Sequence, residues 1–542
     1  MAFERKQFRQ RHLLIAATAF FTAIAAIMTW PQVALFTTHA ADHTDVYFNM
    51  WRLGWVAHAL RSGPSSLFDG NIYYPEPNTL AFSDAMLVEG LVAAPLLWAG
   101  VPPVVVHNSL LLGAVIASAV GMFVLVERLT RNRAAAVIAG IIFAFVPYRF
   151  DHYMHMELQW TVWMPWALWA VHRTIDSGRW QHGLQAGVFV ALQTLSSVYY
   201  GVFLAAILPV VGGLLLLSVP RPQALRAFRA LALGAAAAAI ICSLYAVPYL
   251  AAGRQVGGRS IEEISKFSAR PSDYLVATPD NRIYGGLVAA PSERRLFPGI
   301  VPVLLAITGL LLRRPTMVAV AYLIGLVIAF EMSLGLHGYT YRFLHDHVPV
   351  LAGLRAAARL GIFVVFFLAV LAALGYAALH DAVSSTTRRV LAVMIPCALL
   401  IEYSVFPRQL VSYDNFAPQV YAFLARLPPG VLAEFPMPSV NTVPGPDARY
   451  TYMSTFHWNR LVNGYSGYHP PSYLRRLDHL QSFPDRSSLD VLRGAGVNYV
   501  IVHLSEYESE KELLLQLHTH PELVVQGLLN DGRGKAILYR LE

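Results

Sequence analysis

Long apolar runs separated by short polar segments fill the chain from residue 13 to about residue 406. The first run, 13–35, exceeds the roughly 20 residues that a helix needs to cross a bilayer. Ten further runs follow at about 103–127, 134–150, 157–171, 183–198, 202–218, 231–251, 298–312, 316–335, 359–379 and 390–406. This pattern predicts a polytopic α-helical membrane protein with about eleven transmembrane helices. Only 14% of the residues are charged, against about 25% in soluble domains, which agrees with that class.

Basic residues determine the predicted orientation. Residues 5–12 are rich in Arg and Lys, so the N-terminus is predicted to be cytoplasmic. The apolar segment Met86–Trp98 is short for a span and is predicted to be an interfacial or re-entrant helix. Counting it as a span would place Arg128 and Arg133 outside, against the positive-inside rule. Eleven spans put the C-terminus outside, and cytoplasmic anchoring explains the net charge of +8 without nucleic-acid binding.

The composition changes near residue 407, where charged residues and prolines return. Segments Val431–Phe435, Asn498–His503 and Ala536–Arg540 are predicted strands, and Ser488–Arg493 and Glu508–His518 are predicted to be helical. We therefore predict a transmembrane domain over 1–406 and an extracytoplasmic soluble α/β domain over 407–542. The transmembrane domain would carry outer loops at about 37–102, 252–297 and 336–358.

Two acidic residues, Asp42 and Asp45, open the first outer loop. A carboxylate that is partly desolvated by the bilayer can have a raised pKa and act as a general base. The alternative is that Thr44 or Asp45 only caps the helix that follows. That helix, about 46–60, is predicted to lie in the membrane interface because its two tryptophans recur at i and i+4.

The link between the third and fourth predicted spans carries five ionisable groups, Arg149, Asp151, His152, His155 and Glu157. Imidazole and carboxylate groups bind divalent cations, so Asp151, His152 and His155 are candidate metal ligands. They can equally orient a substrate phosphate together with Arg149. A third interpretation is a solvated turn whose histidines contact lipid head groups.

Arginines in the predicted outer loops are exceptions to the positive-inside rule. Arg270 and Arg282 lie in the loop at 252–297, and Arg355 and Arg359 stand before the tenth span. Guanidinium groups match phosphate oxygens in pairs, so one interpretation is binding of an anionic lipid head group such as a polyprenyl phosphate. Arg355 and Arg359 would share one face if helical. The alternative is that these arginines contact ordinary phospholipids or pair with nearby acidic residues, namely Glu262, Glu263, Asp273, Asp280 and Glu293.

The layout resembles the GT-C superfamily of membrane glycosyltransferases. A cytoplasmic N-terminus, one span, an outer loop opening with an acidic residue, many further spans and an outer α/β domain all fit. Three segments also resemble bacterial multipass proteins in or near that superfamily. They are Asp45 through His58, Pro147 through His155, and Gly464–Pro470 with the sequence GYSGYHP.

The resemblance implies a donor that is a polyprenyl-phosphate-linked sugar, held among membrane lipids at the bacterial inner membrane. It implies that Asp45 is the catalytic carboxylate of an inverting transfer, with Asp42 as the alternative. Arg355, Arg359 and Arg149 would stabilise the departing lipid phosphate. The acceptor would be an envelope glycan, lipid or protein.

Two other functions stay open. One is a transporter or flippase of lipid-linked glycans, although the spans show no inverted repeat. The other is a non-catalytic envelope protein whose outer domain binds glycan. The sequence leaves the sugar, the metal dependence and the oligomeric state undetermined.

Overall fold

The computed structural model describes residues 2–348 and 353–542, so residues 349–352 of the predicted loop 336–358 lie outside the described part. Contacts divide the chain into two compact units. The helical unit comprises the residues up to Ala34, Ser109–Tyr245 and Gly258–Gln409, and the mixed unit comprises Leu35–Asn108, Ala246–Gly257 and Leu410–Glu542. The last boundary lies near the predicted one at 406–407. The first predicted outer loop, 37–102, groups with the C-terminal region.

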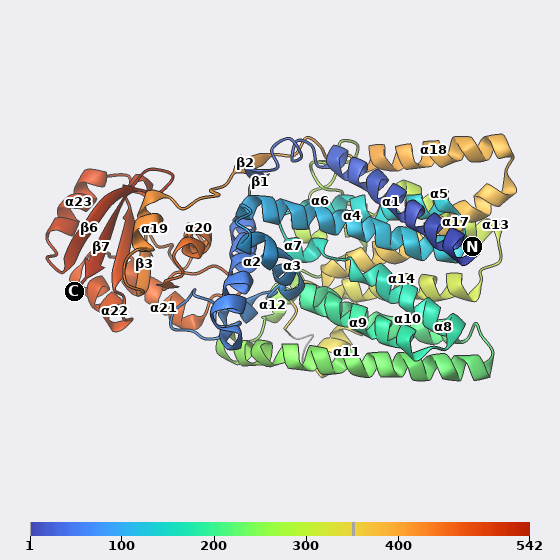
Figure 1. Cartoon of the computed structure of the whole chain (residues 1–542), viewed down its shortest axis with the longest axis horizontal. Helices are drawn as coiled ribbons and strands as arrows, with labels where there is room; N and C mark the ends of the chain where they lie inside the picture. The colour runs from blue at the N-terminus through green and yellow to red at the C-terminus, as the bar shows by residue number, and fades with distance from the viewer. Residues whose placement is uncertain (1, 349–352) are drawn as a thin grey trace. The chain divides into compact units, whose positions relative to one another are not determined.

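Each predicted span coincides with helical structure (Figure 1). The helices are α1 (Ala2–Met28), α4 (Pro103–Thr130), α5 (Arg133–Phe145), α8 (Trp163–Ser177), α9 (Trp180–Ser196), α10 (Val198–Leu216), α11 (Arg221–Val256), α13 (Ile300–Leu312), α14 (Met317–Ser333), α17 (Gly361–Ala382) and α18 (Ser385–Glu402). Among the described residues, six helical stretches are long and apolar enough to cross a membrane. The multi-pass class is confirmed, and the number eleven stays a prediction.

Two of the predicted spans are interrupted. Helix α5 ends before Pro147, which begins the short α6 (Pro147–Asp151). Proline lacks an N–H and cannot continue the hydrogen-bond ladder of α5. The next run is divided into α7 (Met156–Gln159) and α8. The polar link between the third and fourth predicted spans is therefore folded into two short helices.

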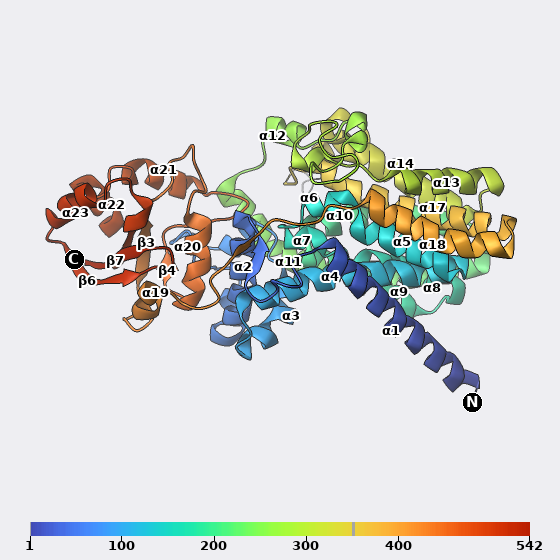
Figure 2. The same cartoon turned by 90° about the horizontal axis from the view of Figure 1, so that it is seen from above.

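Helix α17 lies at the centre of the helical unit, with α5, α13 and α14 packed against it (Figure 2). Its most apolar stretch is 89% buried, against 22% for the corresponding stretch of α11. A Cβ atom on Gly375 of α17 would lie 1.8 Å from the Leu305 carbonyl oxygen of α13. The glycine therefore permits the two helix backbones to touch, as small residues do between membrane helices.

A five-stranded sheet forms the C-terminal part of the mixed unit. Its order is β4-β3-β5-β7-β6, from the strands Arg460–Leu461, Val431–Phe435, Tyr499–His503, Lys535–Leu541 and Leu523–Asn530. Strands β4, β3 and β5 are parallel, while β7 is antiparallel to β5 and β6. Every residue of β3 and β5 is buried, as expected for central parallel strands covered on both faces. The helices α19 (Gln419–Leu424), α20 (Asp447–Met453), α21 (Pro471–Leu480), α22 (Arg486–Gly494) and α23 (Glu510–His518) accompany the sheet.

The first predicted outer loop joins this C-terminal region by its backbone. Strand β1 (His39–Ala41) pairs antiparallel with β2 (Leu410–Ser412). Helix α2 (Thr44–Ser62) follows β1 and packs against α3 (Leu87–Trp98), where Gly90 meets Val56.

The α2 tryptophans, from which an interfacial helix is predicted, pack inside the mixed unit, and the interfacial position of the helix stays a prediction. Trp51 is 0% exposed and Trp55 is 8% exposed. Their indole N–H groups donate to the Asn71 Oδ1 at 3.0 Å and to the Leu67 carbonyl at 2.8 Å. The i, i+4 spacing of the tryptophans marks the face of α2 that packs inside the mixed unit. The same spacing is expected for a helix that lies in the membrane interface, so the sequence does not distinguish the two.

Candidate active site

Asp45 lies in the first turn of α2, and His43 is the residue that caps this helix. The Asp45 backbone N–H donates to the His43 Nδ1 at 3.1 Å, so the expectation that Thr44 or Asp45 is the cap is wrong. A carboxylate at this position is stabilised by the partial positive charge of the helix N-terminus.

The Asp45 side chain is 16% exposed, and groups of the protein contact both of its carboxylate oxygens. The Tyr465 hydroxyl donates a short hydrogen bond to Asp45 Oδ1, and the His43 Nδ1 lies 3.5 Å from Oδ2. Burial, and next the charge of Asp45, raise the pKa of Tyr465, so its phenol stays protonated and remains a donor. Asp42 is exposed, in contrast to Asp45.

Tyr465 belongs to the segment GYSGYHP, which packs against the loop after α2. Gly464 lies so close to Tyr73 that a Cβ would come within 2.7 Å of its ring, and the Tyr73 hydroxyl bonds the His469 Nδ1 at 2.8 Å. The Ser472 hydroxyl donates to Glu76 at 2.5 Å. These contacts fix the position from which Tyr465 reaches Asp45.

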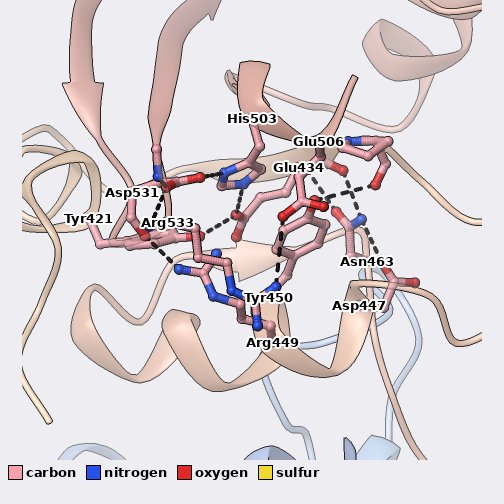
Figure 3. A network of polar contacts seen from close by, with 12 residues as sticks. Tyr421, Glu434, Asp447, Arg449, Tyr450, Asn463, His503, Glu506, Asp531 and Arg533 are labelled. Carbon is pink, nitrogen blue, oxygen red and sulfur yellow. Dashed lines mark hydrogen bonds and ion pairs between the residues drawn. The ribbon is translucent and has the colours of Figure 1, made fainter. Parts of the chain in front are cut away.

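A buried polar network lies at the carboxyl ends of β3 and β5 (Figure 3). The His503 Nε2 is 2.9 Å from Glu434 Oε2, and its Nδ1 is 2.6 Å from Asp531 Oδ2. The Tyr421 hydroxyl donates to Glu434 at 2.7 Å. Burial opposes the charged imidazole, but the hydrogen bonds that the imidazole donates to the Asp531 and Glu434 carboxylates raise the pKa of His503 above its ordinary value.

Asn463 connects this network to the segment that holds Asp45. Its side-chain amide donates to the Glu434 carbonyl and to Asp447 Oδ1, both at 2.9 Å. Burial raises the pKa of Asp447 to about 7. Because Asn463 precedes Tyr465 by two residues, the network sets the backbone that presents the Tyr465 phenol. None of these residues was identified from the sequence. Glu434 and His503 could have been found from their positions at the carboxyl ends of two predicted strands, because functional groups gather at that edge of a parallel sheet.

In the helical unit, the predicted polar link joins a chain of ion pairs. Asp151 accepts from the Arg295 Nη1 at 2.9 Å. The His152 Nε2 lies 3.8 Å from Glu293, and burial lowers the pKa of His152 to about 3, so its ring is neutral. Arg359 donates to Glu293 from Nη2 at 2.6 Å and from Nε at 3.2 Å. Burial disfavours charge on Glu293, but Arg359 holds its pKa below the usual range.

Arg149 is buried and donates to neutral acceptors. Its Nε bonds the Phe143 carbonyl at 2.8 Å, its Nη1 bonds the Gln159 carbonyl at 3.1 Å, and its Nη2 bonds the Thr161 hydroxyl. This geometry ties α5, α7 and the start of α8 together. The guanidinium of Arg149 therefore donates to groups of the protein, whereas the resemblance implies that it binds a phosphate.

Arg355 and Arg359 do not share a helix face, because α17 begins only at Gly361. Arg355 precedes the short turn Ala357–Leu360, in which Arg359 lies. Arg355 donates to Glu263 at 3.1 Å and is 32% exposed, whereas Arg359 is 7% exposed. The two cations thus pair with different carboxylates, as the alternative interpretation of these loops predicted.

The remaining predicted binding residues lie in varied settings. Arg270 is exposed and its backbone N–H donates to Asp273 at 2.7 Å, while Arg282 donates to the Phe406 carbonyl at 2.8 Å. Glu157 is buried, and the His155 ring lies 5.5 Å from that of His152.

The candidate metal set is not assembled. Across residues 2–348 and 353–542, no group of three or more His, Cys, Asp or Glu side chains is arranged to hold a metal ion. Asp151 is instead paired with Arg295, and His152 faces Glu293.

An apolar groove of about 460 Å³ runs along α9, α10 and α11 in the helical unit. Small residues line it, among them Ala186, Gly201, Ala205 and Ala239. Tyr199, two residues before Gly201, accepts the Arg355 backbone N–H at 3.0 Å and lies under the Arg359 guanidinium. Gly201, which lines the groove, is therefore two residues along the chain from a tyrosine that contacts both Arg355 and Arg359.

No protein-family model and no curated protein matches the chain. Solved structures do. The cryo-EM structure of the arabinofuranosyltransferase AftD from Mycobacteria matches with a TM-score of 0.65 at 14% identity, covering 98% of this chain and 40% of that one. A mutant of AftD matches with a TM-score of 0.61 at 17% identity, covering 98% and 41%.

The archaeal oligosaccharyltransferase AglB from Archaeoglobus fulgidus, solved with an inhibitory peptide and a dolichol-phosphate, matches with a TM-score of 0.50 at 13% identity. The match covers 95% of this chain and 73% of AglB. These likenesses show the fold, which the chain shares with these two membrane glycosyltransferases, as the resemblance noted in the sequence predicts. The chain spans about two fifths of the length of AftD.

Proposed function

We propose that the chain is an integral membrane glycosyltransferase. It would transfer a sugar from a polyprenyl-phosphate-linked donor to an envelope glycan, lipid or protein on the outer face, with inversion. The observation that supports this best is Asp45 itself, a partly exposed carboxylate in the first turn of α2, held by Tyr465 on one oxygen. It occupies the loop after the first span of a GT-C fold.

In the proposed reaction, Asp45 accepts the proton of an acceptor hydroxyl as that oxygen attacks the anomeric carbon. The bond between the anomeric carbon and the phosphate oxygen breaks, and its electron pair leaves with the lipid phosphate. Tyr465 donates to Oδ1, and the His43 Nδ1 lies 3.5 Å from Oδ2, so both groups would orient the carboxylate toward the acceptor hydroxyl. A base positioned in this way contributes typically 10²–10⁴-fold to the rate.

The donor would be held by two features of the helical unit. Arg355 is the arginine of its pair that reaches solvent, so we assign it to the donor phosphate. Arg359 and Glu293 would position the segment that carries it, and Arg149 would keep the link between α5 and α8 in place. The groove along α9–α11 suits an isoprenoid chain, and the dolichol-phosphate in AglB is a carrier of this chemical class.

Mass spectrometry of envelope glycans from cells lacking the gene tests the proposal. Cells would be complemented with wild type, Asp45→Asn or Asp42→Asn at matched protein abundance. We expect a glycan short by one sugar mass, restored by wild type and by Asp42→Asn and not by Asp45→Asn. Restoration by Asp45→Asn would remove Asp45 as the base, and unchanged glycan masses in the deletion strain would remove the transferase assignment.

A further inference from the structure

A second cavity, in the mixed unit, is walled largely by aromatic rings. It has a volume of about 300 Å³ and lies between α2, the end of α3 and the segment after α20. One face of α2 contributes Met50, Gly54, His58 and Arg61, at helical spacing. We call this cavity the aromatic pocket. Its size is at the lower end of small-molecule sites.

The rings of the aromatic pocket are held in fixed orientations by neighbouring groups. Trp458 stacks on His58 with centroids 4.1 Å apart and an 18° angle. Trp98 is 40% exposed, its indole N–H donates to the Ala57 carbonyl at 3.0 Å, and the Arg61 guanidinium lies 4.5 Å above its ring. Because these rings are already held in place, less conformational freedom would be lost when a molecule binds in the pocket, which lowers the free-energy cost of binding.

Trp458 is held in a strained backbone conformation. Its φ is +54°, a region that bulky residues rarely adopt and that costs about 1–3 kcal/mol. Its N–H donates to the Ser454 carbonyl at 2.8 Å, and the next N–H, of Asn459, donates to the His457 Nδ1 at 3.0 Å. Strain of this kind persists where it directs a side chain to a task, and here it turns the indole toward α2.

The chemistry of the aromatic pocket matches an uncharged sugar ring. A pyranose or furanose presents C–H groups on its faces and hydroxyls on its rim. Trp458, Trp98 and Phe456 line the pocket with aromatic surface, one face of Trp458 being covered by His58 and one face of Trp98 by Arg61, and Thr455 adds a hydroxyl. The single cation, Arg61, already lies over Trp98, so the pocket is not built for an anion.

We propose that the aromatic pocket binds a neutral sugar residue of the acceptor glycan. The acceptor role rests on the proposed function, whereas sugar binding by the pocket does not. The pocket and Asp45 belong to the same compact unit, and both are carried by α2. A glycan bound there would be anchored to the helix whose first turn holds the base.

Calorimetry and tryptophan fluorescence on the purified full-length protein test the inference. The probes are hexasaccharides of arabinan, mannan, glucan and galactan. The variants are Trp458→Ala and, on a different element, Trp98→Ala, each checked for an unchanged unfolding temperature. Trp180→Ala is the matched control, since Trp180 is 55% exposed in the helical unit and does not line the pocket.

We expect at least one hexasaccharide to bind, at least tenfold weaker binding in both pocket variants, and unchanged binding in Trp180→Ala and in Asp45→Asn. Absence of binding to all four probes, or wild-type affinity in both pocket variants, would overturn the inference. Normal binding by Asp45→Asn with no loss of transfer in cells would refute the proposed function alone. Loss of transfer in Asp45→Asn with no sugar binding would refute the pocket alone.

Discussion

The setting of Asp45 is made by a residue 420 positions away in the sequence, Tyr465. The local pattern around Asp45 indicated an acidic residue at a helix start, and it could not indicate which hydroxyl would reach it. The segment GYSGYHP was singled out by resemblance, and the contact with Asp45 gives that segment a physical role. It supplies one donor to a carboxylate that must stay ionised to act as a base.

Replacing Tyr465 by Phe should weaken the base without removing it. Hydrogen bonds to charged groups are worth about 1.5–3 kcal/mol, so we expect kcat/KM at acidic pH to fall about tenfold to a hundredfold. The donor stabilises the ionised carboxylate, so its loss should move the acid limb of the pH–rate profile to higher pH. Tyr339→Phe, at a tyrosine 90% exposed in the helical unit, is the control. A uniform loss of rate at every pH would instead indicate only altered packing.

Arg355 and Arg359 show why the sequence alone could not decide between a lipid phosphate and a protein carboxylate as the partner of an arginine. An arginine near a membrane boundary needs a partner, and both a lipid phosphate and a protein carboxylate satisfy that need. The sequence offers Glu263 and Glu293 among the possible partners, and they are the carboxylates that pair with Arg355 and Arg359. Which cation meets which carboxylate depends on the tertiary fold of the loops.

At the scale of elements, apolar length predicted the helices well. The runs at 298–312 and 316–335 match α13 and α14 within two residues, because lipid and the bundle core both demand apolar side chains. Strand β6 was missed, since Leu523–Asn530 alternates weakly and contains Gly527 and Gln526. The network around His503 was missed because its members are isolated polar residues within or beyond buried strands.

The close contact of α13 with α17 predicts that a larger residue at Gly375 destabilises the protein. A methyl group at Gly375 would overlap the Leu305 carbonyl of α13, so Gly375→Ala must push the helices apart. Overpacking typically costs about 1–3 kcal/mol, and we expect a lowered unfolding temperature in detergent. Gly113→Ala in α4 is the matched control, because nothing lies within 4 Å of the added atom. Equal unfolding temperatures for the two variants would contradict this packing.

The sheet makes a prediction about pH. The pKa of His503 is raised in the folded state, so the folded protein binds a proton that the unfolded chain releases near pH 6.5. The resulting stabilisation is complete below that pH and is lost as pH rises through the folded pKa. The unfolding temperature of wild type should therefore exceed that of His503→Gln by less as the pH rises from 6.5 into the alkaline range. An advantage that grows with pH would show that His503 is neutral.

At the scale of the whole molecule, the groove along α9–α11 would hold the polyprenyl chain of the donor that we propose. Ala239→Phe should fill the groove and raise KM for a long-chain polyprenyl donor about tenfold, with kcat little changed. Ala236→Phe lies on the same helix, is exposed and does not line the groove, so it should leave KM unchanged. A donor with a shortened chain should be insensitive to both substitutions. Equal effects of the two variants would exclude the groove as the donor site.

The pairing of β1 with β2 has a consequence for biogenesis. His39 leaves the ribosome 373 residues before Ser412, its partner in the register. At about 5–20 residues per second, that interval is on the order of tens of seconds. During this time the segment carrying Asp45 has neither its partner strand nor Tyr465. The nascent protein therefore carries Asp45 in an unassembled setting, and the enzyme we propose becomes competent only when the last quarter of its chain has been made.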